Sequence, residues 1–328
     1  MTDQKKNILI TGASGFLGRY IIDYLLPNPL YNIIALGFNN SLSQEGLKFY
    51  SCDLTDIFQL ESYVKEADIV IHAAGYISFE RSDYEKLMNV NARGTENLVN
   101  LCLEHQVEKL VYVSSIAAFP VDETSGIVTE SHRFKDRKFT TEYGLSKYIG
   151  ESHVWRAYAE GLNTCILNPS LIIGEGDWSK GTPSFFPTIA NGLKYYPTGS
   201  TGIVYAGDVA NFIKLIIDHE LEHNQYVLSA ENMSFKELFS LIALSVGQKS
   251  PHIPIKGQFK WFAFLIDRVR KYLFGKYGYL SRQNLRTISG SRDYDHTLSL
   301  TLRDFNYHSI SDVVQTIGQS YLQYVKEK

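Results

Sequence analysis

Short runs of apolar, β-forming residues alternate with longer segments of helical periodicity through the first half of the chain. Strands that are buried on both faces read as continuous apolar runs, and helices between such strands are typical of βαβ units. The alternation therefore predicts an α/β fold with a doubly wound parallel (Rossmann) sheet. The predicted strands span 7–11, 33–36, 69–72, 109–113 and 164–167, and the predicted helices span 16–26, 59–65, 84–105 and 141–159.

After about Pro169 this rhythm gives way to loops rich in glycine and proline. At 328 residues the chain is long enough for two domains. We predict a nucleotide-binding domain over 1–167, completed by part of 203–228, and a smaller substrate-binding lobe over 168–328. The second half contains a predicted strand at 226–228 and predicted helices at 208–217, 234–246, 258–274 and 310–325.

Composition excludes several classes of protein. Lys and Arg number 32 against 35 Asp and Glu, a net charge of -3, so no excess of positive charge is available to bind a nucleic acid. Cys52, Cys102 and Cys165 lie far apart, as expected for reduced thiols in a cytoplasmic protein rather than for a disulfide framework or a metal site. The most apolar stretch, 261–266, is too short to span a bilayer.

The first predicted strand leads directly into a glycine signature, Thr-Gly12-Ala-Ser-Gly15-Phe-Leu-Gly18. In a dinucleotide-binding βαβ unit the first glycine makes the tight turn and the second lets the backbone approach a pyrophosphate. The third lets the helix pack against the strand, and the helix N-terminus attracts the anion. Because the motif opens the first βα unit of the chain, it predicts a dinucleotide site.

The choice between NAD and NADP stays open in the sequence. An NAD site usually has an acidic residue at the end of the second strand, and residues 36–40, Leu-Gly-Phe-Asn-Asn, contain neither an acid nor an arginine. Arg19 is compatible with a 2′-phosphate and equally with a solvated surface position.

Tyrosine and lysine occur at the spacing YxxxK three times, at Tyr143/Lys147, Tyr272/Lys276 and Tyr324/Lys328. In the first pair, positions i and i+4 share a face of the predicted helix before the last strand of the first half. Ser114 and Ser115 end the preceding strand at the carboxyl edge of the sheet, where ligands of such sheets bind. Only this pair therefore lies where both side chains can meet one ligand.

Taken together, these motifs resemble the extended short-chain dehydrogenase/reductases, the NAD(P)-dependent epimerase/dehydratase superfamily, and look closest to its dihydroflavonol reductase and 3β-hydroxysteroid dehydrogenase branch. They occur in family order over about 7–210. Besides the glycine signature, the matching pieces are Cys52-Asp53-Leu54, His72-Ala73-Ala74-Gly75, Asn89-x-Asn91-x-x-Gly94-Thr95-x-Asn97, Ser114-Ser115, Tyr143-x-x-x-Lys147, Asn168-Pro169-Ser170 with Gly174, and Ala206-Gly207-Asp208-Val209-Ala210.

The resemblance implies a mechanism. Tyr143 would be the general acid/base, Lys147 would lower its pKa and bind the nicotinamide ribose, and Ser115 would hydrogen-bond the substrate oxygen. Asp53 and Leu54 would contact the adenine, and Asn91 would support the active-site region. The residues expected to contact NAD or NADP are Gly12, Gly15, Phe16, Leu17, Gly18, Asp53, Leu54, Ala73, Ala74, Gly75, Asn91, Tyr143, Lys147 and Pro169.

Other motifs are assigned structural roles. His72 is interpreted as a histidine at a strand end rather than as a catalyst, and Ser114 as a structural serine. The segment His219-Glu-Leu-Glu-His223 matches the HExxH pattern of zinc proteases, but it closes a predicted helix and no third ligand is evident. We therefore predict no metal site.

Three functions remain open. The preferred one is an oxidoreductase that interconverts a ketone or aldehyde and an alcohol on a small, hydrophobic substrate. The first alternative is a nucleotide-sugar epimerase, with charge from Arg268, Arg270, Arg282 and Arg286. The second is a non-catalytic NAD(P) sensor, which has no need of Ser115, Tyr143 and Lys147 together. A sugar 4,6-dehydratase is disfavoured because Ile116-Ala117, rather than an acidic pair, follows Ser115.

The basic, aromatic segment 256–280 is interpreted as an amphipathic lid over the pocket, in preference to a membrane-surface helix. The expected partner is a small-molecule substrate, with no nucleic acid and no membrane contact. The resemblance also implies a homodimer that pairs through the helix before the YxxxK motif and the helix containing it.

Overall fold

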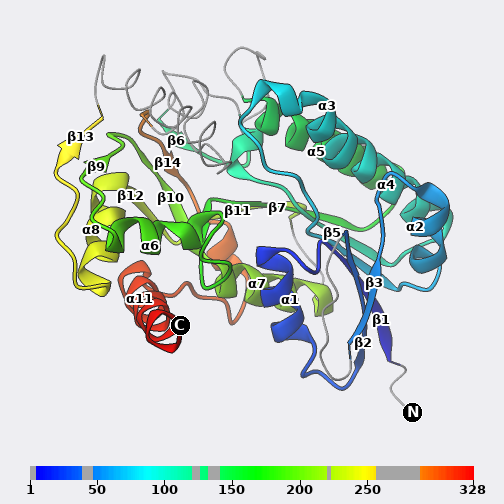
Figure 1. The fold of residues 1–328 in the computed structure, drawn as a ribbon. Helices are drawn as coiled ribbons and strands as arrows, with labels where there is room; N and C mark the ends of the chain where they lie inside the picture. The colour runs from blue at the N-terminus through cyan, green and yellow to red at the C-terminus, as the bar shows by residue number, and fades with distance from the viewer. Residues whose placement is uncertain (1–4, 39–46, 120–125, 132–140, 220–222, 256–288) are drawn as a thin grey trace.

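A seven-stranded parallel sheet lies at the centre of the protein (Figure 1). This computed structural model describes residues 5–38, 47–119, 126–131, 141–219, 223–255 and 289–328. The strand order is β3-β2-β1-β4-β5-β7-β11, which confirms the predicted doubly wound sheet, with the order reversing between β1 and β4. The strands are β1 (Lys6–Thr11), β2 (Tyr31–Gly37), β3 (Lys48–Ser51), β4 (Ile69–His72), β5 (Lys109–Val113), β7 (Thr164–Pro169) and β11 (Gln225–Leu228).

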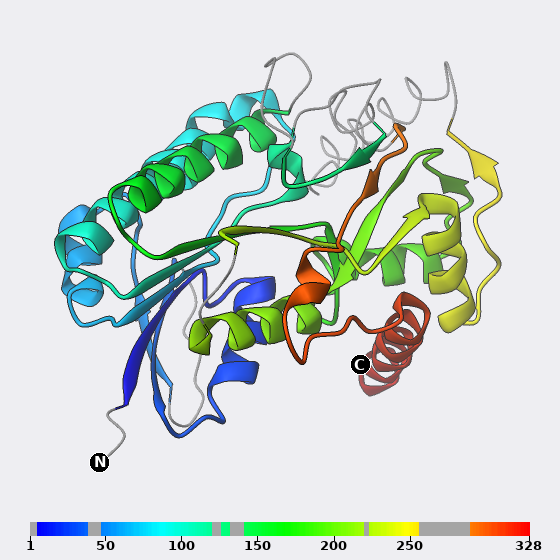
Figure 2. The ribbon, with the colours of Figure 1, turned by 180° about the vertical axis from the view of Figure 1, so that it is seen from behind.

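Helices cover both faces of this sheet, as the views from the front and from behind show (Figures 1 and 2). Because successive side chains of a strand point to opposite faces, Ile8 and Ile10 pack on one side and Leu9 on the other. The side of Ile8 is covered by α1 (Phe16–Leu25) and α7 (Ala206–Asp218), and the side of Leu9 by α2 (Ile57–Val64), α4 (Gly94–Glu104) and α5 (Glu142–Ala159).

The helical segment predicted at 84–105 is helical, but it is not one regular α-helix. It consists of α3 (Tyr84–Leu87), a π-helical stretch Met88–Arg93 and then α4. A π-helical turn widens the helix by one residue and is frequent at functional sites. Here it contains Asn91, one of the predicted site residues.

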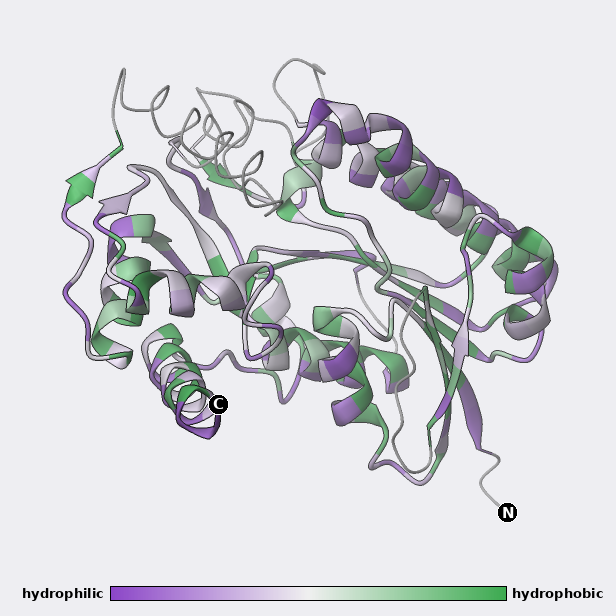
Figure 3. Ribbon diagram, viewed as in Figure 1, coloured by the Kyte–Doolittle hydropathy of each residue, from purple (hydrophilic) through white to green (hydrophobic). Residues whose placement is uncertain are grey.

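The second half of the chain forms a smaller lobe. A three-stranded sheet combines β8 (Leu171–Ile173), β10 (Ser200–Tyr205) and β12 (Glu231–Ser234), and α6 (Phe185–Ala190), α8 (Phe235–Ser245) and α11 (Ile310–Glu327) pack against one another beside it. Figure 3 shows hydrophobic residues along the central strands and alternating hydropathy along the helices, as amphipathic packing requires. Two strand pairs complete the lobe: β9 (Tyr195–Tyr196) with β13 (Ile253–Pro254), and β6 (Ile127–Val128) with β14 (Asp293–Tyr294).

The chain returns to the larger sheet after it has entered the smaller lobe, because α7 and β11 follow β8 and β10. The predicted helices at 208–217, 234–246 and 310–325 are confirmed as α7, α8 and α11, whereas the one at 258–274 lies outside the described residues. Among the residues that the structure describes, no helix is long and apolar enough to cross a membrane.

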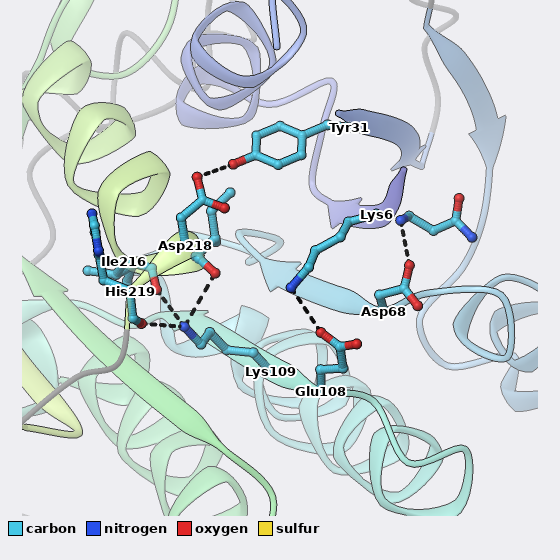
Figure 4. Close-up of polar contacts among 10 residues, drawn as sticks. Lys6, Tyr31, Asp68, Glu108, Lys109, Ile216, Asp218 and His219 are labelled. Atoms are coloured by element: carbon cyan, nitrogen blue, oxygen red, sulfur yellow. Dashed lines mark hydrogen bonds and ion pairs between the residues drawn. The ribbon is translucent and has the colours of Figure 1, made fainter. Parts of the chain in front are cut away.

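The C-terminus of α7 is held by a buried lysine at the amino edge of the sheet (Figure 4). Lys109 Nζ donates to the carbonyl oxygens of Ile216, at 2.7 Å, and His219, at 2.8 Å. The Tyr31 hydroxyl donates to the carboxylate of Asp218, on the same helix. A cation is favourable at a helix C-terminus, where carbonyl groups lack helical partners. Lys109 therefore joins β5 to the last turn of α7.

We expect Lys109→Met to destabilise the protein by about 2–3 kcal/mol, because it removes charged hydrogen bonds and leaves buried carbonyl groups unpaired. Chemical denaturation measures the loss. The matched control is Lys6→Met, since Lys6 forms an exposed ion pair with Glu108 at 3.1 Å and its loss costs at most about 1 kcal/mol. Equal effects of the two substitutions would contradict the role assigned to Lys109.

Candidate active site

The glycine signature forms a turn that only glycine fits. Gly12 has a φ of +71°, and a Cβ placed on it would lie 2.6 Å from the backbone nitrogen and Cα of Ala74. A Cβ on Gly18 would lie 2.2 Å from the carbonyl oxygen of Gly12. The structure thus brings the predicted residues Gly12, Gly18 and Ala74 into direct contact.

Helix α1 begins at this turn with no side-chain cap. Gly15 is its N-cap residue, and its backbone N–H donates to the carbonyl oxygen of Gly12 at 2.9 Å. The first N–H groups of a helix lack helical acceptors and attract anions. The backbone close to Gly15 therefore suits a pyrophosphate, which is the group that the glycine signature is expected to bind.

Phe16 faces the loop that follows β8. A Cβ on Gly174 would lie 3.1 Å from its ring, and a Cβ on Gly176 would lie 3.0 Å from it. Leu17, the next predicted residue, lies on the buried face of α1. Pro169 ends β7 and pairs with Leu228 of β11, so it also lies at the carboxyl edge of the sheet.

The loop after β3 contains Asp53 and Leu54, the two residues predicted to contact the adenine. One oxygen of the Asp53 carboxylate accepts hydrogen bonds from the backbone N–H and the hydroxyl of Thr55, at 2.9 and 2.8 Å. The carbonyl oxygen of Leu54 accepts from Asn97 of α4 at 3.1 Å. The loop therefore follows β3 at the same edge of the sheet as the glycine turn. Phe38, after β2, is 63% exposed, and the neighbouring Asn39 and Asn40 lie outside the described residues.

Helix α5 presents Tyr143 and Lys147 from its first two turns. Thr141 caps this helix by accepting from the backbone N–H of Gly144 at 2.9 Å. The side chain of Ser115, which follows β5, acts on the hydroxyl of Tyr143 and favours its deprotonation. Lys147 Nζ donates to the carbonyl oxygen of Val113 at 2.7 Å. The structure thus brings the three predicted catalytic residues together where β5 ends.

Burial controls the protonation of this group. It raises the pKa of Tyr143 to about 12, and the side chain of Ser115 acts in the opposite direction. Burial lowers the pKa of Lys147 to about 7, and the negative charge of Glu151 opposes that shift. The lowering of the Tyr143 pKa that the resemblance implied is not seen in this structure, where the raised pKa keeps Tyr143 protonated at neutral pH.

Asn91 supports the helix that carries the tyrosine. Its amide nitrogen donates to Ser146 Oγ and to the carbonyl oxygen of Tyr76, both at 2.9 Å, and its amide oxygen accepts from the backbone N–H of Tyr76 at 2.7 Å. Ser146 Oγ in turn donates to the carbonyl oxygen of Tyr143 at 2.7 Å. Asn91 therefore links the loop after β4 to the first turn of α5.

His72 is buried, and its ring links two threonines. Thr95 Oγ1 donates to the carbonyl oxygen of Asn91 at 2.7 Å, so it accepts from His72 Nε2 at 2.9 Å. Thr11 Oγ1 then donates to His72 Nδ1 at 2.7 Å. Burial lowers the pKa of His72 to about 3, with a smaller contribution from the charge of Lys147. A neutral ring with both nitrogens engaged is consistent with the structural role predicted for His72.

Two other sequence motifs fall largely on residues that are not described. Glu220, Leu221 and Glu222 of the HExxH match and the whole of 256–280 lie outside the described residues. The same holds for the four arginines between 268 and 286.

The sequence reasoning missed Glu151 and Ser146. Both lie on the buried face of α5, with Ser146 three residues and Glu151 eight residues after Tyr143. A glutamate at helical spacing from the YxxxK pair is a signal that could have identified the first of them.

Comparison with known proteins agrees with this geometry. A family model described as "NAD dependent epimerase/dehydratase family" matches residues 8–229. A putative UDP-glucose 4-epimerase of Methanocaldococcus jannaschii is 28% identical over 262 residues, covering 73% of this chain and 82% of that protein. Tetraketide alpha-pyrone reductase 2 of Arabidopsis thaliana is 26% identical over 279 residues, covering 76% and 84%.

Two further similarities extend over nearly the whole chain. The 3 beta-hydroxysteroid dehydrogenase/Delta 5→4-isomerase of Vaccinia virus (strain Western Reserve) is 25% identical over 342 residues, covering 93% of this chain and 94% of that protein. The crystal structure of gox2253 superposes with a TM-score of 0.81 at 24% identity, covering 98% of this chain and 99% of that one. At this identity, the structural similarity supports the fold alone.

Proposed function

This chain belongs to the NAD dependent epimerase/dehydratase family, within the extended short-chain dehydrogenase/reductases, and from that membership we propose a specific reaction. We infer that it interconverts a ketone or aldehyde and an alcohol on a small hydrophobic substrate, with NAD or NADP as the cofactor. The observation that carries the proposal is the meeting of Ser115, Tyr143 and Lys147 at the end of β5.

The cofactor is assigned to the carboxyl edge of the sheet. The fit rests on the turn at Gly12 and Gly18, which has no room for a Cβ, and on the uncapped start of α1 at Gly15. When bound, the nicotinamide supplies or accepts the hydride. We assign cofactor contacts to Gly12, Gly15, Phe16, Leu17, Gly18, Asp53, Leu54, Ala73, Ala74, Gly75, Asn91, Tyr143, Lys147 and Pro169.

Tyr143 is assigned the proton transfer. A tyrosine with a pKa of about 12 is protonated at neutral pH, so it can donate its proton to a carbonyl oxygen as that oxygen becomes an alcohol. Ser115, whose side chain acts on Tyr143, orients the same oxygen. Lys147 supplies positive charge from the next turn of α5. The reverse reaction needs deprotonated Tyr143 and is therefore favoured at higher pH.

Apolar side chains of the loop after β4, one of them packed against Tyr143, favour a hydrophobic substrate. The ring of Phe79 packs edge-on against Tyr143, with centroids 6.1 Å apart. Ile77, on the same loop, is 65% exposed. Lys180, one of two basic residues between β7 and α7, forms an ion pair with Asp177 at 3.3 Å. We assign the choice of substrate to this loop and to the lobe over 168–328.

A nucleotide-sugar epimerase is the second candidate, and the similarity to the putative epimerase of M. jannaschii favours it. The two reactions differ in their balance of cofactor. A reductase consumes NADH or NADPH from solution, whereas an epimerase returns the hydride to the same substrate and causes no net change. A non-catalytic sensor would do neither.

The test is therefore net cofactor turnover. Purified protein is incubated with NADH or NADPH and a panel of apolar ketones, while UDP-sugars are tested separately for epimerisation by NMR. We expect loss of absorbance at 340 nm with an apolar ketone. Epimerisation of a sugar without net oxidation of NADH or NADPH would overturn the proposal in favour of the epimerase. Cofactor binding without either reaction would indicate the non-catalytic sensor.

We also propose a cytoplasmic homodimer. In support, Cys52, Cys102 and Cys165 are all free and buried, and α4 and α5, through which family members pair, lie side by side on one face of the sheet. Light scattering coupled to size-exclusion chromatography tests the dimer.

A further inference from the structure

A buried glutamate stands on the same face of α5 as the proposed catalytic pair. Glu151 lies four residues after Lys147 and eight after Tyr143, so all three follow one stripe of the helix. Glu151 is buried, with only 6% of the residue exposed. A carboxylate is not buried at such a position without partners that stabilise its charge.

One partner of Glu151 connects it to Ser115. Glu151 Oε1 accepts from Asn168 Nδ2 at 2.5 Å, and the same nitrogen donates to the carbonyl oxygen of Ser115 at 3.0 Å. Asn168 Oδ1 accepts from Gln225 Nε2 at 2.8 Å, which settles the orientation of the amide. Glu151 therefore reaches the backbone of Ser115 through a single side chain, across α5 and β7.

The charge of Glu151 also acts on Lys147. Lys147 is 3% exposed, and burial lowers its pKa to about 7 while Glu151 opposes that shift. Within the described part of the chain, the other titratable groups facing Lys147 carry no opposing charge: Tyr143 has a raised pKa, His72 has a lowered one, and the Tyr112 ring lies 4.4 Å from Nζ. Burial and the charge of Glu151 both raise the pKa of Tyr112, so this ring is neutral as well.

We propose that Glu151 is a positioning residue of the active site, which orients Ser115 through Asn168 and keeps a positive charge on Lys147. The roles of Ser115 and Lys147 rest on the proposed function, but the hydrogen bond of Glu151 with Asn168 and its position four residues after Lys147 on α5 do not. Glu151→Gln separates the two effects, because glutamine keeps an oxygen for Asn168 and removes the charge.

The first experiment measures the protonation of Lys147 without any substrate or cofactor. Lysine labelled with ¹³C at Cε is titrated by NMR in the full chain, and the Lys147 signal is identified by its loss in Lys147→Met. We expect the pKa of Lys147 to fall by about 1–3 units in Glu151→Gln, the usual effect of an opposite charge. The control, Glu160→Gln, removes an exposed carboxylate at the C-terminal end of α5 that pairs with Arg156 and should change nothing.

The second experiment follows kcat/KM as a function of pH. Removing the charge should move the loss of activity at high pH to lower pH in Glu151→Gln, with about a tenfold decrease at pH 7.5 and a smaller one at pH 6. Glu151→Asp keeps the charge and should return the profile toward that of the unmodified protein.

The outcomes are distinct. An unchanged Lys147 pKa in folded Glu151→Gln overturns the proposal, and so does an equal loss of activity at every pH, which indicates a purely structural residue. If the unmodified protein turns over no substrate, the proposed function fails, while the NMR titration still decides the role of Glu151.

Discussion

Replacing Tyr143 with phenylalanine is expected to lower kcat by about 10²–10⁴-fold while leaving the affinity for NAD or NADP largely intact. The substitution removes the hydroxyl to which we assign the proton transfer and keeps the ring that packs against Phe79. The measurements are kcat with the substrate identified by the panel and cofactor Kd from fluorescence titration.

The matched control for this substitution is Tyr158→Phe, which removes the hydroxyl of an exposed tyrosine on the same helix. It should leave both quantities unchanged. Near-normal turnover by Tyr143→Phe would show that the acid/base assignment is wrong. A large increase in cofactor Kd would instead mean that the hydroxyl acts in binding.

Gly12→Ala should weaken cofactor binding by at least about tenfold and lower the Tm. The left-handed backbone of Gly12 costs a non-glycine residue about 1–2 kcal/mol, and the new Cβ would lie 2.6 Å from the backbone of Ala74. Relief of that clash requires movement of the loop after β4, which we assign to the cofactor site. Isothermal titration with NAD and NADP and a thermal melt measure the two effects.

Gly247 provides a control with nearly the same backbone strain. Its φ is +70°, but a Cβ there would meet no atom within 4 Å. Gly247→Ala should therefore lower the Tm slightly and leave the cofactor Kd unchanged. If both variants bind the cofactor as the unmodified protein does, close packing at Gly12 is not a requirement of the site.

The doubly wound parallel sheet could be predicted because its strands are buried on both faces. Five apolar runs correspond to β1, β2, β4, β5 and β7, each paired in parallel with its neighbour. The range of β3, Lys48–Ser51, could not be predicted from hydropathy, because it is an edge strand with mostly exposed residues. The π-helical stretch at Met88–Arg93 was also missed, since periodicity does not distinguish it from an α-helix.

The sequence predicts only those residues of the candidate site that belong to recognisable motifs. Ser115, Tyr143 and Lys147 were identified from the order of the motifs, and the structure brings them together. Glu151 carries no such motif, and its contact with Asn168 joins residues of α5 and β7. The pKa of Tyr143 likewise depends on burial, which cannot be read from a spacing of four residues.

The late position of β11 along the chain has a consequence for protein synthesis. A ribosome delivers residues in order, so β7 can pair with β5 long before Gln225–Leu228 exists. During that interval β7 is an open edge that can recruit strands of other nascent chains. Helix α7 and the strands β8 and β10 are made in between, so the larger sheet closes only after much of the smaller lobe has been translated. Translational pausing before Gln225 would therefore prolong the aggregation-prone stage of this protein.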